Sequence, residues 1–273
     1  MPELPEVETT RRGVSPHIEA RVLTGVDIRQ AKLRWPIPVA EVQALVGERL
    51  ESVTRRGKYL LLRFQSGTLI VHLGMSGSLR IINSQEPPLY HDHFDLVFGE
   101  VALRFCDPRK FGCLLWMSAT EGAIEQHKLL EKLGPEPLLE EFTADYLFKK
   151  SRKRTQSLKQ FLMDNHTVVG VGNIYANESL FMAGIKPTRK AGSLTQKESL
   201  RLVEKIKFVL ARSIEQGGTT LRDFVGGDGK PGYFAQQLLV YGRGDKPCVN
   251  CDHLLKEIRL GARSTVYCTK CQK

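Results

Sequence analysis

Four cysteines near the end of the chain have the spacing of a metal site. They are Cys248, Cys251, Cys268 and Cys271, two C-x2-C pairs separated by 16 residues. Each pair can present two thiolates to one ion, and the residues between them can fold as a hairpin. Four thiolates complete a tetrahedral zinc site and leave no position for water. The spacing predicts one structural zinc ion (Zn2+) and disfavours two disulfides, because the chain has no recognisable export signal.

The first residues contain a candidate nucleophile. Removal of Met1 would expose the secondary amine of Pro2, and an α-amino group with a pKa of about 7.7–8.0 is partly neutral near pH 7. Condensed with an aldehyde-like carbon, such an amine gives an iminium, which is an electron sink for elimination. Glu3 follows directly and can transfer a proton there. Alone, a proline at position 2 is a weak indication, because it is common in start sequences.

Two glycine-flanked loops combine apolar and basic side chains. Residues 72–78 end a predicted strand and place Met75 at an exposed tip, and residues 107–112 combine Arg109 with Phe111. An apolar wedge and an arginine on a loop can fill the space that an extruded base leaves in duplex DNA. Either loop by itself is also compatible with an ordinary turn.

Three more residues are candidate phosphate contacts. Lys58 begins a predicted apolar strand and is either an exposed lysine, a phosphate contact or an amine at the site. Asn173 follows two glycines at the start of a predicted helix, where backbone N–H groups favour anions. Arg263 lies at the predicted turn of the cysteine hairpin, within reach of a phosphate or a groove. The glycine-rich residues 217–229 are either a loop that closes over a ligand or a linker.

The charge balance favours a polyanionic partner. Lysine and arginine number 40 against 30 acidic residues, a formal net charge of +10. Residues 149–159 hold six of these cations and no acid, which predicts a basic face; within it Lys153 is a general electrostatic contact to DNA. A solvated helix surface remains the alternative for any single run. Without a signal sequence or a long apolar segment, the chain is expected to be cytoplasmic and to have no membrane contact.

The elements that position these residues change character along the chain. Residues 22–116 predict β structure, with short apolar or alternating runs and a tight hairpin at Gly99-Glu100. A helix is expected from Pro5 to about Ser15. The predicted strands cover residues 58–64, 68–73, 78–82, 94–98 and 101–105.

Helical patterns follow an acidic, proline-containing linker. Thr195 and Glu198 form a capping-box pattern before an apolar stripe that stops at Gly217-Gly218. A shorter helix is expected over 174–183. The expected domains are an N-terminal helix with a β-sandwich (1–130), a linker (131–141), a helical DNA-binding domain (142–242) and a zinc hairpin (243–273).

Together these motifs closely resemble bacterial formamidopyrimidine-DNA glycosylases over nearly the whole chain. The resemblance rests on the Pro-Glu-Leu-Pro-Glu-Val-Glu start, His-Leu-Gly-Met-Ser-Gly, Asp-Pro-Arg-Lys-Phe-Gly, Val-Gly-Asn-Ile-Tyr-Ala and the four cysteines. It implies an α+β fold with a two-layered β-sandwich, a helical domain with a helix–two-turn–helix element, and a zinc β-hairpin. It also implies a monomer that acts on double-stranded DNA, associated with the bacterial nucleoid through that binding.

The implied activity is base excision repair. Such an enzyme flips out and excises oxidised purines (8-oxoguanine and formamidopyrimidines), then cleaves the abasic strand by β,δ-elimination. By resemblance, Pro2 would form the Schiff base, with Glu3, Lys58 and Arg263 as further catalytic residues. The implied DNA contacts are His72, Met75, Arg109, Phe111, Asn173 and Lys153. The family's damaged-base loop corresponds to residues 217–229.

Two other functions remain open from the sequence. One is an endonuclease VIII-like glycosylase for oxidised pyrimidines, although Leu4 and the trio Met75, Arg109 and Phe111 resemble the purine branch. The other is a damage-binding zinc protein without catalysis, whose amino terminus is blocked. Excision of 8-oxoguanine against thymine glycol distinguishes the two enzymes, and the intact mass tests whether Met1 is removed.

Overall fold

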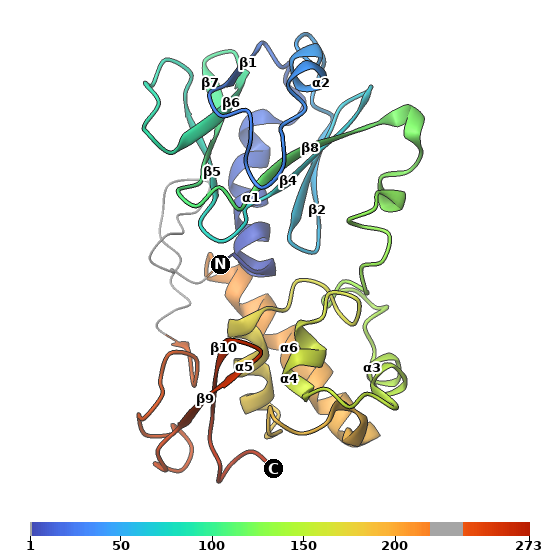
Figure 1. Ribbon diagram of the computed structural model, residues 1–273, viewed down its shortest axis with the longest axis vertical. Coiled ribbons are helices and arrows are strands. Elements are labelled where there is room, and N and C mark those ends of the chain that lie inside the picture. Colours follow the sequence, from blue (N-terminus) through green and yellow to red (C-terminus); the bar gives the residue numbers. More distant parts are fainter. Residues whose placement is uncertain (1, 219–236) are drawn as a thin grey trace. The chain divides into compact units, whose positions relative to one another are not determined.

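The structure, a computed structural model, describes residues 2–218 and 237–273 (Figure 1). Two compact units divide the chain. The described part of the first comprises residues 2–131 and 216–218, and that of the second comprises 132–215 and 237–273. Because the first unit contains the expected nucleophile and the second the cysteine hairpin, the two are taken in turn.

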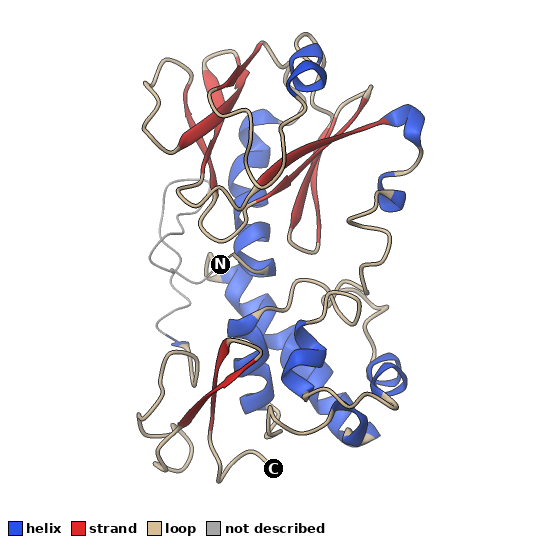
Figure 2. Cartoon of the chain, in the orientation of Figure 1, coloured by secondary structure: helices blue, strands red, loops and turns tan. Residues whose placement is uncertain are grey.

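The first unit contains two antiparallel four-stranded sheets, drawn as red arrows in Figure 2. One sheet has the order β1-β6-β7-β5 and the other β2-β3-β4-β8. Their bounds are β1 Gly25–Ile28, β2 Ser52–Arg56, β3 Tyr59–Arg63, β4 Gly67–His72, β5 Ser78–Asn83, β6 Asp92–Phe98, β7 Val101–Cys106 and β8 Cys113–Ser118. Side chains from both sheets share one apolar core, so the expected two-layered sandwich is confirmed.

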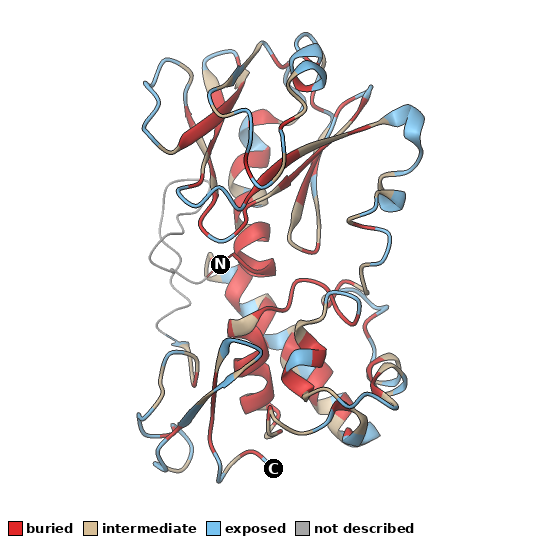
Figure 3. Ribbon diagram, in the orientation of Figure 1, coloured by how far each residue is buried: buried red, intermediate tan, exposed pale blue. Residues whose placement is uncertain are grey.

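Helix α1 (Leu4–Ile18) contacts strands of both sheets. It is largely buried along its length, as Figure 3 shows. Val7, Val14 and Ile18 belong to the sandwich core. The helix is therefore fixed to the sandwich through its apolar side chains, and its first residues are fixed with it. Helix α2 (Val39–Ala44) and the 3-10 turns η1 (Ala119–Glu121) and η2 (Ile124–Gln126) complete the unit.

The second unit is a group of helices with a terminal hairpin. The helices are α3 (Ala144–Ser151), α4 (Leu158–Met163), α5 (Asn173–Met182), the 3-10 turn η3 (Ala191–Ser193) and α6 (Gln196–Glu215), and the hairpin is β9 (Lys256–Leu260) with β10 (Arg263–Tyr267). Helix α6 packs against α3 and α5, and β10 contacts α5. The predicted capping box is present, with Glu198 N donating to Thr195 Oγ1 at 3.2 Å and Thr195 N donating to Glu198 Oε2 at 2.9 Å.

Most predicted elements are found within a few residues of the expected bounds. The β6–β7 hairpin turns at Gly99-Glu100, where Gly99 has φ +72°. One boundary differs in a way that matters: Lys58 lies in the turn before β3 rather than in the strand. The reason is the preceding Gly57, whose positive φ of +57° starts a tight turn there.

In the described residues, none of the helices has the length and apolar character needed to cross a bilayer.

Candidate active site and zinc centre

Pro2 and Glu3 lie at the amino end of the buried helix α1. Both residues are buried, and Glu3 is the N-cap of the helix. Glu3 N donates to Glu6 Oε2 at 2.8 Å, one half of a capping box between these two glutamates. A helix amino terminus stabilises negative charge. The carboxylate that the sequence singled out is therefore held directly beside the expected nucleophile by the helix that follows it.

Lys58 occupies a two-residue hairpin turn. Arg56 and Tyr59 are the last paired residues of β2 and β3, which leaves Gly57 and Lys58 as the loop. Only Gly57 of these two has a positive φ, as in hairpin turns with glycine first. The backbone of the lysine is thus placed by a tight two-residue turn at the end of a sheet.

Strand register brings the turn with Lys58 and two predicted loops to one end of the second sheet. Tyr59 at the start of β3 pairs with His72 at the end of β4, and their rings lie 4.9 Å apart. His72 in turn pairs with Cys113 at the start of β8. The turn with Lys58, the loop after His72 and the loop before Cys113 are therefore neighbours. Lys58 and Cys113, which are more than 50 positions apart in sequence, lie at one end of the sheet for this reason.

The two loops with the candidate wedge residues pack backbone against backbone. A Cβ on Gly74 would lie 2.4 Å from Gly112 N, so only glycine permits this approach. Met75 is 41% exposed and Phe111 is 50% exposed. The prediction that Met75 lies exposed on a tip is confirmed, and an exposed phenylalanine accompanies it.

His72 is held as a neutral imidazole in one tautomer. Gly74 N donates to His72 Nδ1 at 2.9 Å, so the ring proton lies on Nε2. Burial lowers the pKa of His72 to about 4, with further contributions from the positive charges of Lys58 and Arg34. At neutral pH the side chain is therefore an uncharged donor, and its charge does not add to that of Lys58.

A basic and aromatic hollow lies beside the loop with Arg109. Its volume is about 250 Å³, and its lining includes Arg29, Tyr90, His91 and Lys110. The ring of Tyr90 is almost fully exposed. The sequence reasoning did not single out these residues, because no motif marks them; an exposed tyrosine next to a histidine in a proline-rich loop was the available signal.

In the second unit, one asparagine connects two predicted phosphate contacts. Asn177, one turn into α5, donates from Nδ2 to Asn173 O at 2.6 Å and accepts from Val266 N at 2.9 Å. Val266 belongs to β10, which begins with the exposed Arg263. The turn before it, Gly261-Ala262, has positive φ at both residues, as in type I′ hairpins. Asn173 and Arg263 are thus positioned relative to each other.

The basic run 149–159 does not form a single exposed face. Lys153 is exposed, with φ +61°, but Lys159 is 1% exposed. Lys159 Nζ donates to Ser264 O at 2.6 Å and to Thr265 Oγ1 at 2.7 Å. The expectation of one basic face is wrong for this residue, because α4 turns it towards the hairpin. Its charge stabilises the strand after Arg263 instead of attracting a distant polyanion.

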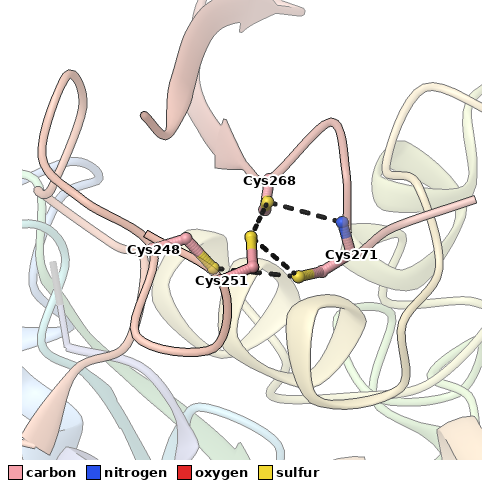
Figure 4. A group of neighbouring side chains, drawn as sticks. All are labelled: Cys248, Cys251, Cys268 and Cys271. Carbon is pink, nitrogen blue, oxygen red and sulfur yellow. Dashed lines mark hydrogen bonds between the residues drawn. The ribbon is translucent and has the colours of Figure 1, made fainter. Parts of the chain in front are cut away.

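The four cysteines converge as the spacing predicts, and Figure 4 shows their sulfur atoms pointing toward one another. All four Sγ atoms lie within 4.8 Å of each other, with Cys251–Cys268 at 3.6 Å and Cys248–Cys271 at 3.9 Å. A tetrahedral zinc with Zn–S of about 2.3 Å separates its sulfurs by about 3.8 Å. These separations are too long for disulfides, whose S–S bond is about 2.05 Å. The donor set fits one structural zinc ion with no open position.

Three family models match successive parts of the chain. The formamidopyrimidine-DNA glycosylase N-terminal domain matches residues 1–114, and the H2TH domain of the same family matches 133–225. A zinc finger found in FPG and IleRS matches 245–273. The chain belongs to the formamidopyrimidine-DNA glycosylase family. The expected helix–two-turn–helix element and the structural zinc are thereby confirmed.

Relatives of this glycosylase family match over the full chain. Formamidopyrimidine-DNA glycosylases of Cellvibrio japonicus and Pseudomonas aeruginosa are 65% and 55% identical, each covering 100% of both chains. A Lactococcus lactis FPG mutant, solved with DNA that contains Fapy-dG, has a TM-score of 0.92 at 30% identity and covers 100% of both chains. The MutM (FPG) protein of Thermus thermophilus has a TM-score of 0.88 at 37% identity, covering 99% and 98%.

Several side chains that organise this glycosylase fold were not predicted. Asp107 is buried and accepts from Gly112 N at 2.8 Å, which shapes the loop with Arg109. Glu178 accepts the N–H groups of Leu239, Val240 and Tyr241 at 2.8, 3.0 and 2.8 Å. An aspartate before proline is a turn signal, whereas nothing near Glu178 in sequence marks it. The loop predicted over 217–229 lies, from 219 onward, outside the described residues.

Proposed function

We propose that this chain is a bifunctional glycosylase and abasic-site lyase of base excision repair, directed to oxidised purines in duplex DNA. The observation that carries the proposal is the pairing of Pro2 with Glu3 at the buried start of α1. Membership of the formamidopyrimidine-DNA glycosylase family supports the same reaction. Solved structures of the similar Lactococcus lactis protein hold DNA that contains Fapy-dG or an abasic site, which supports those two substrate classes here.

The reaction begins at the amine of Pro2, which is available once Met1 is removed. The amine nitrogen attacks C1′ of the flipped nucleotide, the C1′–N bond to the damaged base breaks, and the departing base takes up the proton that the amine nitrogen loses. Glu3 supplies a proton that opens the sugar ring, so that the lone pair of nitrogen forms the iminium. Placing this carboxyl at a helix N-cap beside the amine lets it alternate between acid and base without moving.

The iminium withdraws electrons from the sugar and permits two eliminations. Loss of a C2′ proton expels the 3′ phosphate, and loss of a further proton expels the 5′ phosphate, which leaves a one-nucleotide gap. Lys58 and Arg263 are proposed to stabilise or protonate these leaving phosphates as their negative charge develops. Hydrolysis of the remaining imine by water releases the sugar fragment and restores the amine.

DNA binding is proposed to use both units through different contacts. In the first, Met75, Arg109 and Phe111 fill the gap and contact the orphaned cytosine, while His72 donates to phosphate. The hollow with Tyr90 and His91 extends this surface along the strand. Unstacking a base costs a few kcal/mol, and inserted side chains offset part of this cost.

In the second unit, Asn173 is the proposed phosphate contact. Its Oδ1 is buried and makes no hydrogen bond within the described residues. A phosphate cannot satisfy this acceptor, because phosphate oxygens also accept; the side-chain Nδ2 of Asn173 and the backbone N–H groups at the start of α5 are the donors proposed for the phosphate. Arg263 and Lys153 add charge, so the affinity is expected to fall steeply with salt.

Borohydride trapping tests the proposal. The purified protein is incubated with a duplex that contains 8-oxoguanine opposite cytosine, reduced, and mapped by peptide mass spectrometry. An adduct on Pro2 is expected, and a Pro2→Gly variant, with a primary amine, serves as the comparison. An adduct on another residue, or none although Met1 is removed and DNA is bound, contradicts the mechanism. Stronger excision of thymine glycol than of 8-oxoguanine contradicts the purine preference.

A further inference from the structure

Glu8, five residues after Glu3, is a buried carboxylate of α1 with three arginines around it. Its carboxylate accepts from Arg11 Nη2 at 2.9 Å, Arg12 Nε at 2.8 Å and Arg55 Nε at 3.2 Å. Burial of this carboxyl raises its pKa, but the hydrogen bonds from Arg11 and Arg12 and the charges of Arg11 and Arg55 outweigh it and hold the pKa at about 2. Glu8 is therefore ionised at every pH at which the protein works.

Arg55 joins this cluster to the turn with Lys58. It lies in β2, its side chain is 12% exposed, and its Nη1 donates to Gly57 O at 2.8 Å. The same guanidinium thus bonds a side chain of α1 with one nitrogen and the hairpin turn with another. A planar fork with fixed directions can make both bonds at once, and a lysine ammonium on a flexible stem cannot hold the same geometry.

The two ends of this connection carry the reacting groups. Helix α1 begins beside Pro2 and Glu3, and the residue after Gly57 is Lys58. Both belong to the first unit. The connection through Glu8 and Arg55 reaches the lysine turn itself, whereas the contact of Arg11 Nη1 with Val53 O at 3.4 Å holds α1 to the middle of β2. A rotation of the turn would change the position of the lysine amine without unfolding the sheet.

We infer that Arg55 is a positioning residue of the reaction, which fixes the Lys58 turn relative to the helix that presents the nucleophile. This inference rests on the proposed roles of Pro2 and Lys58. Misplacement of a catalytic group by about 1 Å costs on the order of 100-fold in rate. Loss of the Arg55 guanidinium and its two hydrogen bonds is therefore expected to lower the rate of the chemical steps by about 10- to 100-fold, although Arg55 itself touches no reacting atom.

A double-mutant cycle with Lys58 tests the inference. Single-turnover rates of base excision and of strand cleavage are measured for Arg55→Lys, Arg55→Gln, Lys58→Gln and the two doubles. If Arg55 acts through Lys58, each double variant has the rate of Lys58→Gln alone, because the lysine it positions is gone. Losses that multiply show an independent structural role and overturn the inference, as does a wild-type rate in both Arg55 variants.

Controls separate positioning from folding and from the proposed function. Arg63→Gln, in β3 with a 69% exposed side chain paired to Glu51, removes an arginine of the same sheet and is expected to keep the wild-type rate. If Arg55→Gln does not fold, Arg55→Lys, which keeps the charge beside Glu8, carries the cycle. If Lys58→Gln keeps the wild-type rate while Pro2 still traps, this inference falls and the proposed function stands. If the wild type traps no adduct, the proposed function itself falls.

Discussion

Asp107 accepts the hydroxyl hydrogen of Ser76 across 2.7 Å, although the two residues lie 31 positions apart. The same carboxylate accepts the backbone N–H groups of Arg109 at 3.2 Å and Gly112 at 2.8 Å. One buried side chain therefore shapes the Arg109 loop and ties it to the loop with Met75. The proposed wedge is thus one preorganised unit rather than two independent turns, which lowers the entropy lost on binding DNA.

Asp107→Asn is expected to loosen the contact between these two loops. An amide NH2 must face at least one of the three donors, and an unsatisfied buried donor costs about 1–3 kcal/mol of stability. Excision of 8-oxoguanine opposite cytosine should slow, because Arg109, a proposed contact to the orphaned cytosine, is no longer held. Thermal unfolding and paired excision rates are the measurements. Ser76→Ala, which leaves two backbone donors on the carboxylate, should have a smaller effect; equal effects would contradict the shared role.

The low pKa of His72 makes stability depend on pH. Burial is the main cause of its fall from 6.5 to about 4. Between pH 4 and pH 6.5 the imidazole of His72 is protonated in the unfolded chain but neutral in the folded one. The contribution of His72 to the free energy of unfolding is therefore complete above pH 6.5 and is lost as the pH falls towards 4. At 1.36 kcal/mol per unit this contribution is at most about 3 kcal/mol.

His72→Asn is the matched variant for this effect, because its amide oxygen can accept from Gly74 N in place of Nδ1. Its free energy of unfolding should change less than that of the wild type between pH 6.5 and 4, and the two should run parallel above pH 7. Denaturant titrations at several pH values measure this. Parallel curves over the whole range would mean that His72 titrates normally.

Local sequence patterns were enough to predict the helices, the strands and the four zinc ligands. The positions of the site residues relative to one another depend on contacts between residues far apart in sequence. The cysteine spacing was enough to predict the zinc ion, and the family resemblance that the motifs around Pro2, Met75 and Arg109 carry implied the sandwich. Sequence could not place Lys58 at one sheet edge with Phe111, because that follows from strand register across β3, β4 and β8. The number of charged residues along a segment also cannot distinguish a buried lysine from an exposed one.

Loss of the zinc ion should unfold the hairpin and leave the sandwich intact. Structural zinc contributes about 10–16 kcal/mol to small zinc domains, so Cys248→Ser should release the metal and weaken DNA binding through Arg263. Cys106→Ser, which removes a thiol of the first unit, should keep one ion per chain. Zinc content by mass spectrometry and affinity by fluorescence anisotropy are the readouts. Undiminished affinity without zinc would contradict the role of the hairpin.

Lys159 and Lys153 should behave differently although both belong to one basic run. Lys159→Met removes the donors to Ser264 O and Thr265 Oγ1, so a half-buried carbonyl and a buried hydroxyl lose a donor at a cost of about 1–3 kcal/mol. Because Arg263 directly precedes Ser264 in β10, the rate of strand cleavage should fall together with the stability of the protein. Lys153→Gln should only weaken binding and lower its salt dependence by about one charge, without changing lesion preference. Equal effects in salt-dependent binding and single-turnover cleavage assays would mean that both lysines act as general charge, contrary to the burial of Lys159.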